Sequence, residues 1–477
     1  MSKVDTAWLR MEQPTNLMMI TGVVTLDQHM DYERLLDTVR TRWLSFRRFR
    51  QKPVDSPSGA YWVLDEDFDI NTHVRRVALP GKADRAELEE YVSDLASTAL
   101  DKSRPLWQFH YVENYVGGPV IVQRIHHCYA DGIALVQVFL SLTDPSPEPR
   151  PSARNPQQWK LKRKKESSIF RRLTSPARNS LDLALHWSQR ALQEGLQVVQ
   201  NPERATKYLE EGSGLALELL NSVSLPADPK TLFKGRLGVR KQVAWAEPLP
   251  LDEVKALSKL MGCTVNDLLI AAVTGALRRY MVEQGEAPLK DTEIRATVPV
   301  NLRPLEHARE LGNHFGLVFL SLPVGVANPL ARVRTVHDRM NELKSSKQAA
   351  VSFGLLAALG LGPSALQKPA LDLFSEKAST VLTNVPGPQQ PLFLAGSQVK
   401  DMMFWVPQNG SIGMGVSIMS YDGKVFFGVI TDRRLVSEPR EIIDRFHAEF
   451  DNLAYLSMMI PVDLPESERL AEELLSS

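Results

Sequence analysis

Residues 120–132 read VIVQRIHHCYADG, and this stretch decides the fold. Its first six residues are mostly β-branched and apolar, which predicts a buried strand from Val120 to Ile125. Residues 109–116 precede two glycines and are expected to be the hairpin partner of that strand. Apolar residues 133, 136 and 140 recur at helical spacing, so a helix is expected after Gly132. The two histidines therefore lie where a strand ends and a loop leads into a helix.

Neighbouring strand residues point to opposite faces, so His126 and His127 cannot both face one site. The unperturbed pKa of histidine lies closest to neutrality, which suits a general base. A single histidine at a strand end is also commonly structural. A metal site is disfavoured because adjacent strand histidines diverge and no second cluster has ligand spacing. The residues alone leave a catalytic base and a structural role open.

The motif continues with Asp131 and Gly132. An acidic side chain can fix a loop by pairing with an arginine, and a glycine allows a tight backbone path. Together with the histidines they make the pattern His-His-x-x-x-Asp-Gly, which is more specific than a lone histidine.

This pattern is the motif of the CoA-dependent acyltransferase superfamily, which includes chloramphenicol acetyltransferase and peptide-synthetase condensation domains. More narrowly, the chain resembles the bacterial wax ester synthase/diacylglycerol acyltransferase family. Six further segments match that family in order: residues 4–9 with 14–16, 104–107, 265–267, 299–303, 312–316 and 383–388. Residues 234–236 (Lys-Gly-Arg) depart from it, because the family often has an Asn-Gly-x-Ile segment there. This departure weakens any role that the resemblance could assign to them.

The resemblance implies an α/β fold of two chloramphenicol acetyltransferase-like domains, each a mixed sheet plus helices, with an active-site channel between them. It implies transfer of a fatty acyl group from acyl-CoA, a substrate rather than a cofactor, to a long-chain alcohol or a diacylglycerol. His127 is implied as the general base, because the superfamily's base occupies the second histidine position. Two alternatives are a related acyltransferase that uses a carrier-protein thioester and a non-catalytic lipid-binding protein.

The resemblance also suggests roles for the rest of the motif and for Asn384. His126 and Asp131 complete the catalytic motif, and Asp131 is implied to point away from substrate and to pair with an arginine, for which Arg303 is the candidate. The resemblance also implies that Gly132 contacts the substrate. Asn384 could donate to the oxyanion, or its Asn-Val-Pro-Gly segment could simply form a turn.

Further candidates have a structural alternative. Asn266 and Asp267 lie in the first turn of an expected helix, where capping is favoured over chemistry. Pro105, Leu106 and Trp107 are expected to shape a hydrophobic wall, although Trp107 could equally be core. Gly360 lies in an apolar, small-residue segment, residues 355–366, that is either the lining for a lipid chain or a packed helix.

The composition is that of a globular protein of more than one domain. The chain has 477 residues, 43% hydrophobic and 23% charged, with a formal net charge of +0, which gives no case for nucleic-acid binding. Two cysteines offer no disulfide framework, and the N-terminus lacks a signal-peptide core. No segment reaches the roughly 18 apolar residues of a spanning helix. We expect a cytoplasmic protein that contacts the inner membrane or lipid inclusions peripherally.

Three parts are expected along the chain: residues 1–142 with the histidine motif, a linker over 143–241, and a second acyltransferase half over 242–477. Prolines mark the start of the linker, and a basic run follows at 160–172. That run is a solvated connector, a site for anionic lipid headgroups, or a contact for the phosphates of CoA.

The residue pattern also predicts individual elements. Strands are expected at 21–26, 294–300 and 317–324, with a hairpin of 414–419 and 425–431 around Asp422-Gly423. Helices are expected at 31–43, 84–100, 181–199, 205–223, 251–261, 265–282, 328–349 and 438–457. Asp84 with Glu87, and Thr264, are the expected helix caps.

Overall fold

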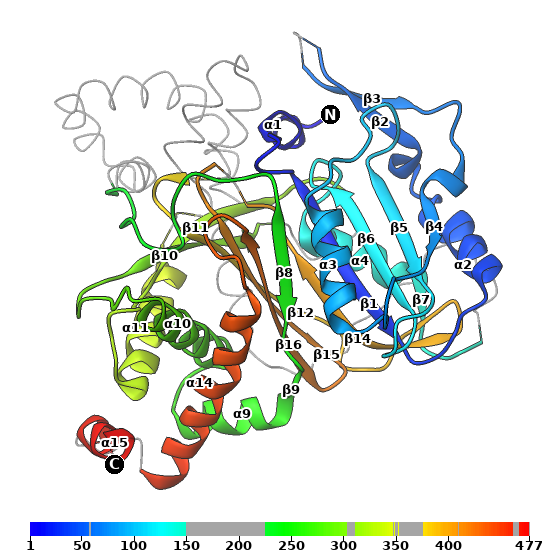
Figure 1. The fold of residues 1–477 in the computed structure, drawn as a ribbon. Helices are drawn as coiled ribbons and strands as arrows, with labels where there is room; N and C mark the ends of the chain where they lie inside the picture. The colour runs from blue at the N-terminus through cyan, green and yellow to red at the C-terminus, as the bar shows by residue number, and fades with distance from the viewer. Residues whose placement is uncertain are drawn as a thin grey trace, which may run out of the picture.

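The computed structural model describes most of both halves of the chain. It describes residues 1–56, 59–148, 225–302, 311–346, 375–408, 410–460 and 467–476, together with the single residues 348 and 352. Within this part, strands form two seven-stranded sheets and one two-stranded hairpin. Figure 1 shows the two sheets side by side, with helices packed around them.

The first sheet is built mainly from the N-terminal half. In spatial order its strands are β4 (Val74–Val77), β5 (Trp107–Val112), β6 (Val120–His126), β1 (Met19–Leu26), β14 (Ser397–Trp405), β13 (Phe393–Leu394) and β7 (Thr143–Asp144). β4 and β5 run parallel and β5, β6, β1 and β14 run antiparallel, so the sheet is mixed. Every residue of β1 is buried, as expected for a central strand covered on both faces.

The second sheet belongs to the C-terminal half. Its order is β11 (Phe315–Leu322), β10 (Ile294–Asn301), β12 (Thr380–Pro386), β15 (Met414–Tyr421), β16 (Lys424–Asp432) and β8 (Lys241–Trp245), and β9 (Leu249–Pro250) also pairs with β16. β12 runs parallel to both of its neighbours, whereas the other pairs are antiparallel. The two sheets are thus of the same mixed kind.

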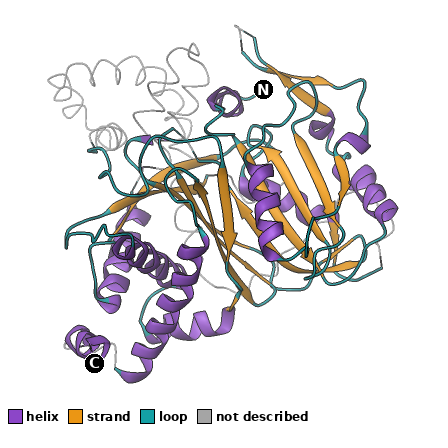
Figure 2. Cartoon of the chain, in the orientation of Figure 1, coloured by secondary structure: helices purple, strands orange, loops and turns teal. Residues whose placement is uncertain are grey.

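Helices cover both sheets (Figure 2). The first half has α1 (Lys3–Met11), α2 (Tyr32–Thr38) continued by a π-helical turn (Val39–Trp43), α3 (Arg85–Ala96) and α4 (Gly132–Leu142), with short 3₁₀ turns at Arg47–Arg50 and Ile70–Thr72 and the hairpin β2 (Gln51–Val54) and β3 (Tyr61–Leu64). The second half has α9 (Leu251–Leu260), α10 (Val265–Glu283), α11 (Pro329–Ser345), α14 (Arg440–Met459) and α15 (Ser467–Ser476).

Local signals in the sequence predict these elements well. The strand before the histidines, its hairpin partner and the helix after Gly132 are all present. Asp84 with Glu87 and Thr264 with Asp267 each form a capping box. The hairpin of β15 and β16 turns at Asp422 and Gly423, whose φ angles of 46° and 73° suit a primed turn. The helices predicted at 181–199 and 205–223, and the basic run, lie outside the described residues.

The predicted division of the chain differs from the division into sheets. β13 and β14 come from the segment assigned to the second half, yet they pair with strands of the first sheet. β14 pairs with β1 from Thr21↔Trp405 to Leu26↔Val399. β7, which lies in the expected linker, also belongs to the first sheet. The sequence does not show this crossing, because pairing between distant strands leaves no local pattern.

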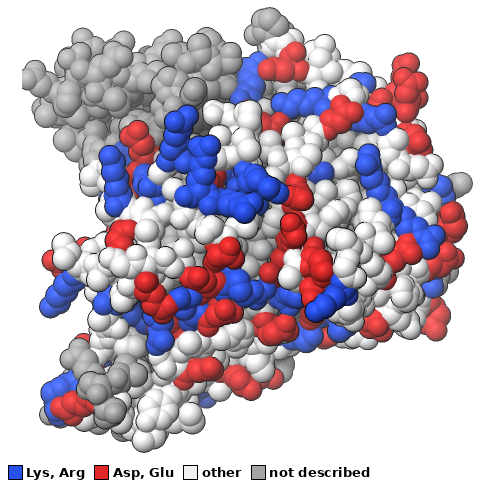
Figure 3. Space-filling model, in the orientation of Figure 1, with Lys and Arg blue, Asp and Glu red and all other residues white. Residues whose placement is uncertain are grey.

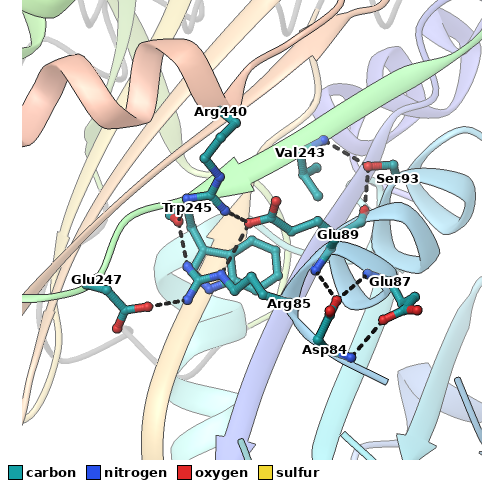
Figure 4. Close-up of polar contacts among 10 residues, drawn as sticks. Asp84, Arg85, Glu87, Glu89, Ser93, Val243, Trp245, Glu247 and Arg440 are labelled. Carbon is teal, nitrogen blue, oxygen red and sulfur yellow. Dashed lines mark hydrogen bonds and ion pairs between the residues drawn. The ribbon is translucent and has the colours of Figure 1, made fainter. Parts of the chain in front are cut away.

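The two halves also meet where α3 packs against β8 (Figure 4). Arg85 lies over the ring of Trp245, with 4.6 Å between the guanidinium carbon and the ring centroid, and donates to the Trp245 carbonyl at 2.5 Å. Glu89 is shared between Arg85 and Arg440. Burial raises the pKa of Glu89, and the two arginines oppose that effect. Ser93 accepts a hydrogen bond from the backbone N–H of Val243 at 3.0 Å.

Among the described helices, none alone is long and apolar enough to cross a membrane. α9 and α10 satisfy length and composition only together, with a bend of 94° between them.

Replacing Ser93 with alanine should weaken the contact between the halves. The variant leaves the buried N–H of Val243 without its acceptor, which costs about 1–3 kcal/mol. Thermal unfolding should therefore show a lower midpoint for Ser93→Ala. Thr98→Ala is the matched control, because the Thr98 side chain is exposed and its hydroxyl donates to the Asp94 carbonyl of α3, and the change should alter stability by less than about 0.5 kcal/mol. Equal midpoints for the two variants would contradict the role of Ser93.

Candidate active site

A cavity of about 110 Å³ lies between the two sheets. Its lining comes from α1, the β6–α4 loop, and strands β10, β11, β12 and β14, and it is mostly apolar. The residues are Trp8, Met11, His127, Asp131, Gly132, Thr297, Pro299, Asn301, Phe315, Leu317, Phe319, Ser375, Val381, Thr383, Asn384, Val385, Phe404, Val406, Pro407 and Ile412. His127 of the histidine motif and Asn384 therefore face one space from opposite halves of the chain.

His127 follows the last residue of β6 and lies in the wall of this cavity. Its backbone N–H donates to the Met18 carbonyl at 2.7 Å, and its own carbonyl accepts from Nδ2 of Asn313 at 2.9 Å. Burial lowers the pKa of His127 to about 3, the neighbouring His126 lowers it further, and the side chain of Asn313 opposes this. The imidazole is therefore neutral at pH 7, which is the form that a base requires.

The N-terminal helix α1 holds the His127 ring in place. Trp8 stacks on that ring with centroids 4.1 Å apart and an interplanar angle of 22°, and Phe315 packs against it from the second sheet at 5.6 Å. Asp5, one turn earlier, accepts hydrogen bonds from the backbone N–H and from Nδ2 of Asn313. Asn313 thereby links α1 to the backbone of His127. Stacking and hydrogen bonding together restrict both the ring and the loop that carries it.

His126 has a different environment, as the alternation of strand faces predicts. Its Nδ1 accepts from the backbone N–H of Cys128 at 3.1 Å, so its proton lies on Nε2. That Nε2 lies 3.1 Å from Glu12, whose other carboxylate oxygen lies 2.9 Å from Lys102. Burial raises the pKa of Glu12, but His126 and Lys102 outweigh this and lower it to about 2. One nitrogen of His126 thus accepts a hydrogen bond and the other lies beside a carboxylate, so His126 supports the strand end instead of facing the cavity.

Asp131 is the N-cap of α4. Oδ1 accepts from the N–H of Ala134 at 2.8 Å, and Oδ2 accepts from the N–H of His314 at 3.0 Å. Asp131 thereby joins the motif loop to the segment that precedes β11, where Ala130 also forms a β-bridge with Gly312. Arg303, its predicted partner, lies outside the described residues. A carboxylate held by two backbone N–H groups serves as a scaffold for the loop.

Asn384 and Asn266 lie together although 118 residues separate them. Nδ2 of Asn384 donates to Oδ1 of Asn266 at 2.6 Å, and Asn384 lies on the cavity wall. Asp267 is fully buried, caps α10 through Thr264, and lies 2.7 Å from Nδ1 of His337. Asp267 thus has the capping position that the sequence predicts, whereas Asn266 contacts a residue of the cavity itself.

Gly132 separates two cavities. It lines the cavity at His127 and also a second cavity of about 60 Å³ between α4 and strands β1, β6 and β14, and Phe404 lines both. A Cβ atom at Gly132 would meet no atom within 4 Å, and its φ is not in the left-handed region. Neither backbone geometry nor packing requires a glycine at this position. A larger residue here would instead fill the open space beside Gly132.

The structure corrects one predicted group and leaves another untested. Pro105, Leu106 and Trp107 are buried, but they line neither cavity. Trp107 packs among His73, Trp43 and Phe109, and its indole N–H donates to the Phe49 carbonyl at 2.8 Å. It is therefore a core residue, since a large aromatic at a strand start is covered by the neighbouring helical turns. Gly360 lies outside the described residues.

Sequence reasoning missed Trp8, Glu12 and Asn313 as parts of the site. Segments 4–9 and 312–316 match the family, but their sequence alone assigns them no role. Nothing in the sequence around Glu12 indicates its contact with His126, because a single acidic residue after a short helix is usually exposed to solvent. Trp8, Glu12 and Asn313 contact the two histidines only because α1 packs across both sheets.

The catalytic-domain model of the wax ester synthase/diacylglycerol acyltransferase family matches residues 1–269, more than half of the chain. The chain belongs to this family. The C-terminal domain model of the same wax ester synthase/diacylglycerol acyltransferase family matches residues 311–454. The two matches include both histidines, Asn266 and Asn384, so the site described above lies in the parts that define the family. The protein is an acyltransferase of this type.

Its curated relatives cover most of the chain. A putative diacylglycerol O-acyltransferase of Mycobacterium bovis and a probable diacylglycerol O-acyltransferase of Mycobacterium tuberculosis are each 28% identical over 423 residues, which is 86% of this chain and 86% of theirs.

Solved structures show the same fold. The wax ester synthase/diacylglycerol acyltransferase of Marinobacter aquaeolei matches with a TM-score of 0.65 and 21% identity, covering 95% of this chain and 98% of that one. The first condensation domain of the calcium-dependent antibiotic synthetase matches with a TM-score of 0.56 and 15% identity, covering 96% and 95%. The expected two-domain, chloramphenicol acetyltransferase-like architecture is confirmed.

Replacing Glu12 with glutamine should destabilise this acyltransferase in a pH-dependent way. The pKa of Glu12 is lowered to about 2 in the fold, so its charge contributes stability above pH 4.5, and that contribution is lost as the pH falls towards 2. At pH 7 the variant should be less stable by about 1–3 kcal/mol, with the difference shrinking below pH 4.5, as measured by chemical unfolding.

Glu113→Gln provides the control for this measurement. Glu113 pairs with Arg76, whose side chain is 61% exposed, so its loss should cost less than about 1 kcal/mol. A Glu12→Gln variant that is as stable as the control at pH 7 would show that the contact with His126 contributes little.

Proposed function

We propose that the protein transfers a fatty acyl group from acyl-CoA to the hydroxyl of a diacylglycerol or a long-chain alcohol, with His127 as general base. The observation that carries the proposal is a neutral, buried imidazole on the wall of a mostly apolar cavity between the two sheets. The names of the curated relatives favour a diacylglycerol as the acceptor.

The proposed reaction is a single displacement in a ternary complex. The acceptor oxygen attacks the thioester carbonyl while His127 takes the hydroxyl proton. The C–O bond forms, the C–S bond breaks, and the thiolate leaves and receives that proton from the imidazolium. A thiolate is a good leaving group, so positioning and base catalysis supply the rate gain. The low pKa of His127 favours the return of the proton, since the buried imidazolium is costly.

A covalent acyl-enzyme has less support from the neighbouring residues. Cys128 is fully buried, and burial raises the pKa of its thiol well above the ordinary value, so it does not form a thiolate nucleophile. Thr383 faces the cavity, but its hydroxyl bonds to the Val416 carbonyl and to Ser417. Neither side chain is activated by a base, which leaves direct attack by the acceptor.

Asn313 and Asn384 have proposed supporting roles. Nδ1 of His127 and Oδ1 of Asn313 are both buried, and neither has a hydrogen-bond partner among the residues that the structure describes. An Nδ1–H directed at Asn313 would fix the tautomer and leave Nε2 as the base. Asn384 uses one N–H to bind Asn266, and its second N–H is available for the oxyanion that forms from the thioester carbonyl.

The second cavity gives a path for an apolar chain. It shares Gly132 and Phe404 with the cavity at His127 and is lined by Ile20, Val24, Ile125, Leu135, Val136, Phe139, Leu140, Met402, Met403 and Met419, among others. A thioester held at His127 could therefore direct its acyl chain beneath α4. Apolar walls of this kind bind a hydrocarbon without leaving a buried polar group unpaired.

Replacing His127 should slow turnover strongly. Palmitoyl-CoA is mixed with dipalmitoylglycerol or hexadecanol, and free thiol is followed. Because general bases typically contribute 10²–10⁴-fold, His127→Ala and His127→Gln should lower kcat by about 100-fold or more. His29→Ala, an exposed histidine away from the cavity, should keep wild-type turnover. Full turnover in both His127 variants would overturn the mechanism, and no turnover by the wild type with either acceptor would overturn the function.

Enlarging Gly132 should separate activity from stability. Gly132→Ala fits without a clash and should preserve or raise the thermal midpoint, because alanine gains about 0.5–1 kcal/mol over glycine within a helix. It should lower kcat/KM for palmitoyl-CoA, and Gly132→Val should lower it further, to about a tenth or less. Wild-type kcat/KM in both variants would show that no substrate passes this residue.

A further inference from the structure

A group of basic residues lies on two loops of the second sheet. These loops are at the edge of the sheet that β8 forms. We call this group the basic rim, and it consists of Lys230, Lys234, Arg236, Arg433 and Arg434. All but Lys234, which is half-buried, are exposed. Figure 3 shows lysine and arginine side chains gathered on this face, over the loop that leads into β8.

The two loops of the basic rim are packed tightly against each other. The N–H of Arg433 donates to the Arg240 carbonyl at 3.0 Å, and the N–H of Gly238 donates to Oδ2 of Asp432 at 2.9 Å. The Arg434 side chain lies over Gly238, where a Cβ atom would stand 3.0 Å from Cδ of Arg434. The arginines are therefore held near one another even though like charges repel.

The basic rim borders the cavity that contains His127. Lys234 forms a β-bridge with Ile412, and its ammonium donates to the carbonyls of Ser375, Glu376 and Ala378, so Lys234 anchors the rim at the cavity and leaves ligand binding to the exposed cations. Ile412 and Ser375 both line that cavity. The remaining cations continue outward from Lys234 along residues 230–236 and 433–434, so the rim connects the cavity wall to solvent.

The exposed arginines of the rim lack acidic partners within the described chain. Arg240 pairs with Asp94 and Lys241 pairs with Asp432, next to the rim. No carboxylate of the described residues pairs with Arg236, Arg433 or Arg434. Asp432, the carboxylate closest to Arg433 in sequence, is fully buried and engaged by Lys241. Uncompensated cations beside a cavity create a positive potential that attracts an anionic ligand.

We propose that the basic rim binds the diphosphate and 3′-phosphate of CoA, while the pantetheine arm carries the thioester past Ile412 towards His127. This proposal rests on the proposed function, which supplies acyl-CoA as the donor. Arginine suits phosphate because its guanidinium donates two parallel hydrogen bonds. The anionic headgroups of a lipid surface share this chemistry, but a membrane-binding face normally adds exposed apolar side chains. Of the large exposed hydrophobic residues described, only Val239 lies on these loops.

Direct binding tests the rim without relying on turnover. Isothermal titration calorimetry compares free CoA, 3′-dephospho-CoA and pantetheine on the wild type and on the triple variant R236Q/R433Q/R434Q. The variant should bind CoA about tenfold or more weakly, a loss of about 1.4 kcal/mol. The control K82Q/K259Q/K290Q removes three exposed lysines elsewhere and should bind CoA as the wild type does. Wild-type affinity for CoA in the rim variant overturns the proposal.

Kinetics and vesicle binding complete the test. The preference of the enzyme for palmitoyl-CoA over palmitoyl-pantetheine, expressed as a ratio of kcat/KM values, should fall at least tenfold in the rim variant and remain in the control. A rim variant that keeps this preference but loses binding to phosphatidylserine vesicles assigns the rim to lipid headgroups and overturns the proposal. If the wild type binds CoA through the rim yet transfers no acyl group, the proposed function fails and the rim does not.

Discussion

Burial of a neutral imidazole between two sheets is the constraint on which the rest of this structure depends. A charged histidine there would lose its hydration, so the fold stabilises the uncharged ring and lowers the pKa of His127 to about 3. Three groups cover the His127 ring and shield it from water. They are Trp8 from the N-terminus, Phe315 from the second sheet, and the strand end of β6. Each cover comes from a different part of the chain.

The paired halves supply these covers because β14 crosses into the first sheet. Trp405 at its end pairs with Thr21 and packs against Trp245 of the second sheet, with ring centroids 5.6 Å apart. Met403 fills the space beside Gly428 of β16. These contacts fix the distance between the two sheets. They thereby also fix the relative positions of the residues that line the cavity between the sheets. The position of Asn384 relative to His127 follows from this arrangement, and no single local motif determines it.

The sequence predicts what is local. The end of β6, the caps at Asp84 and Thr264, and the turn at Asp422 each depend on a few neighbouring residues, and each is present. The divergence of His126 and His127 follows from strand geometry alone. The sequence leaves Trp107 open between a cavity wall and the core, because a large aromatic in a family segment looks the same in either place. The contacts of Glu12, Trp8 and Asn313 depend on tertiary packing, which leaves no periodic pattern.

The crossing of β14 has a consequence for synthesis on the ribosome. β1 emerges first and can pair with β6 once residue 126 is free, yet its other edge stays unpaired until residues 397–405 emerge. During that interval a central strand that is buried along its whole length in the folded protein presents open N–H and C=O groups, which is the kind of edge that recruits other chains. The nascent chain thus has a vulnerable period set by the distance in sequence between β1 and β14. A fragment that ends after residue 269, the limit of the catalytic-domain match, would retain this open edge permanently.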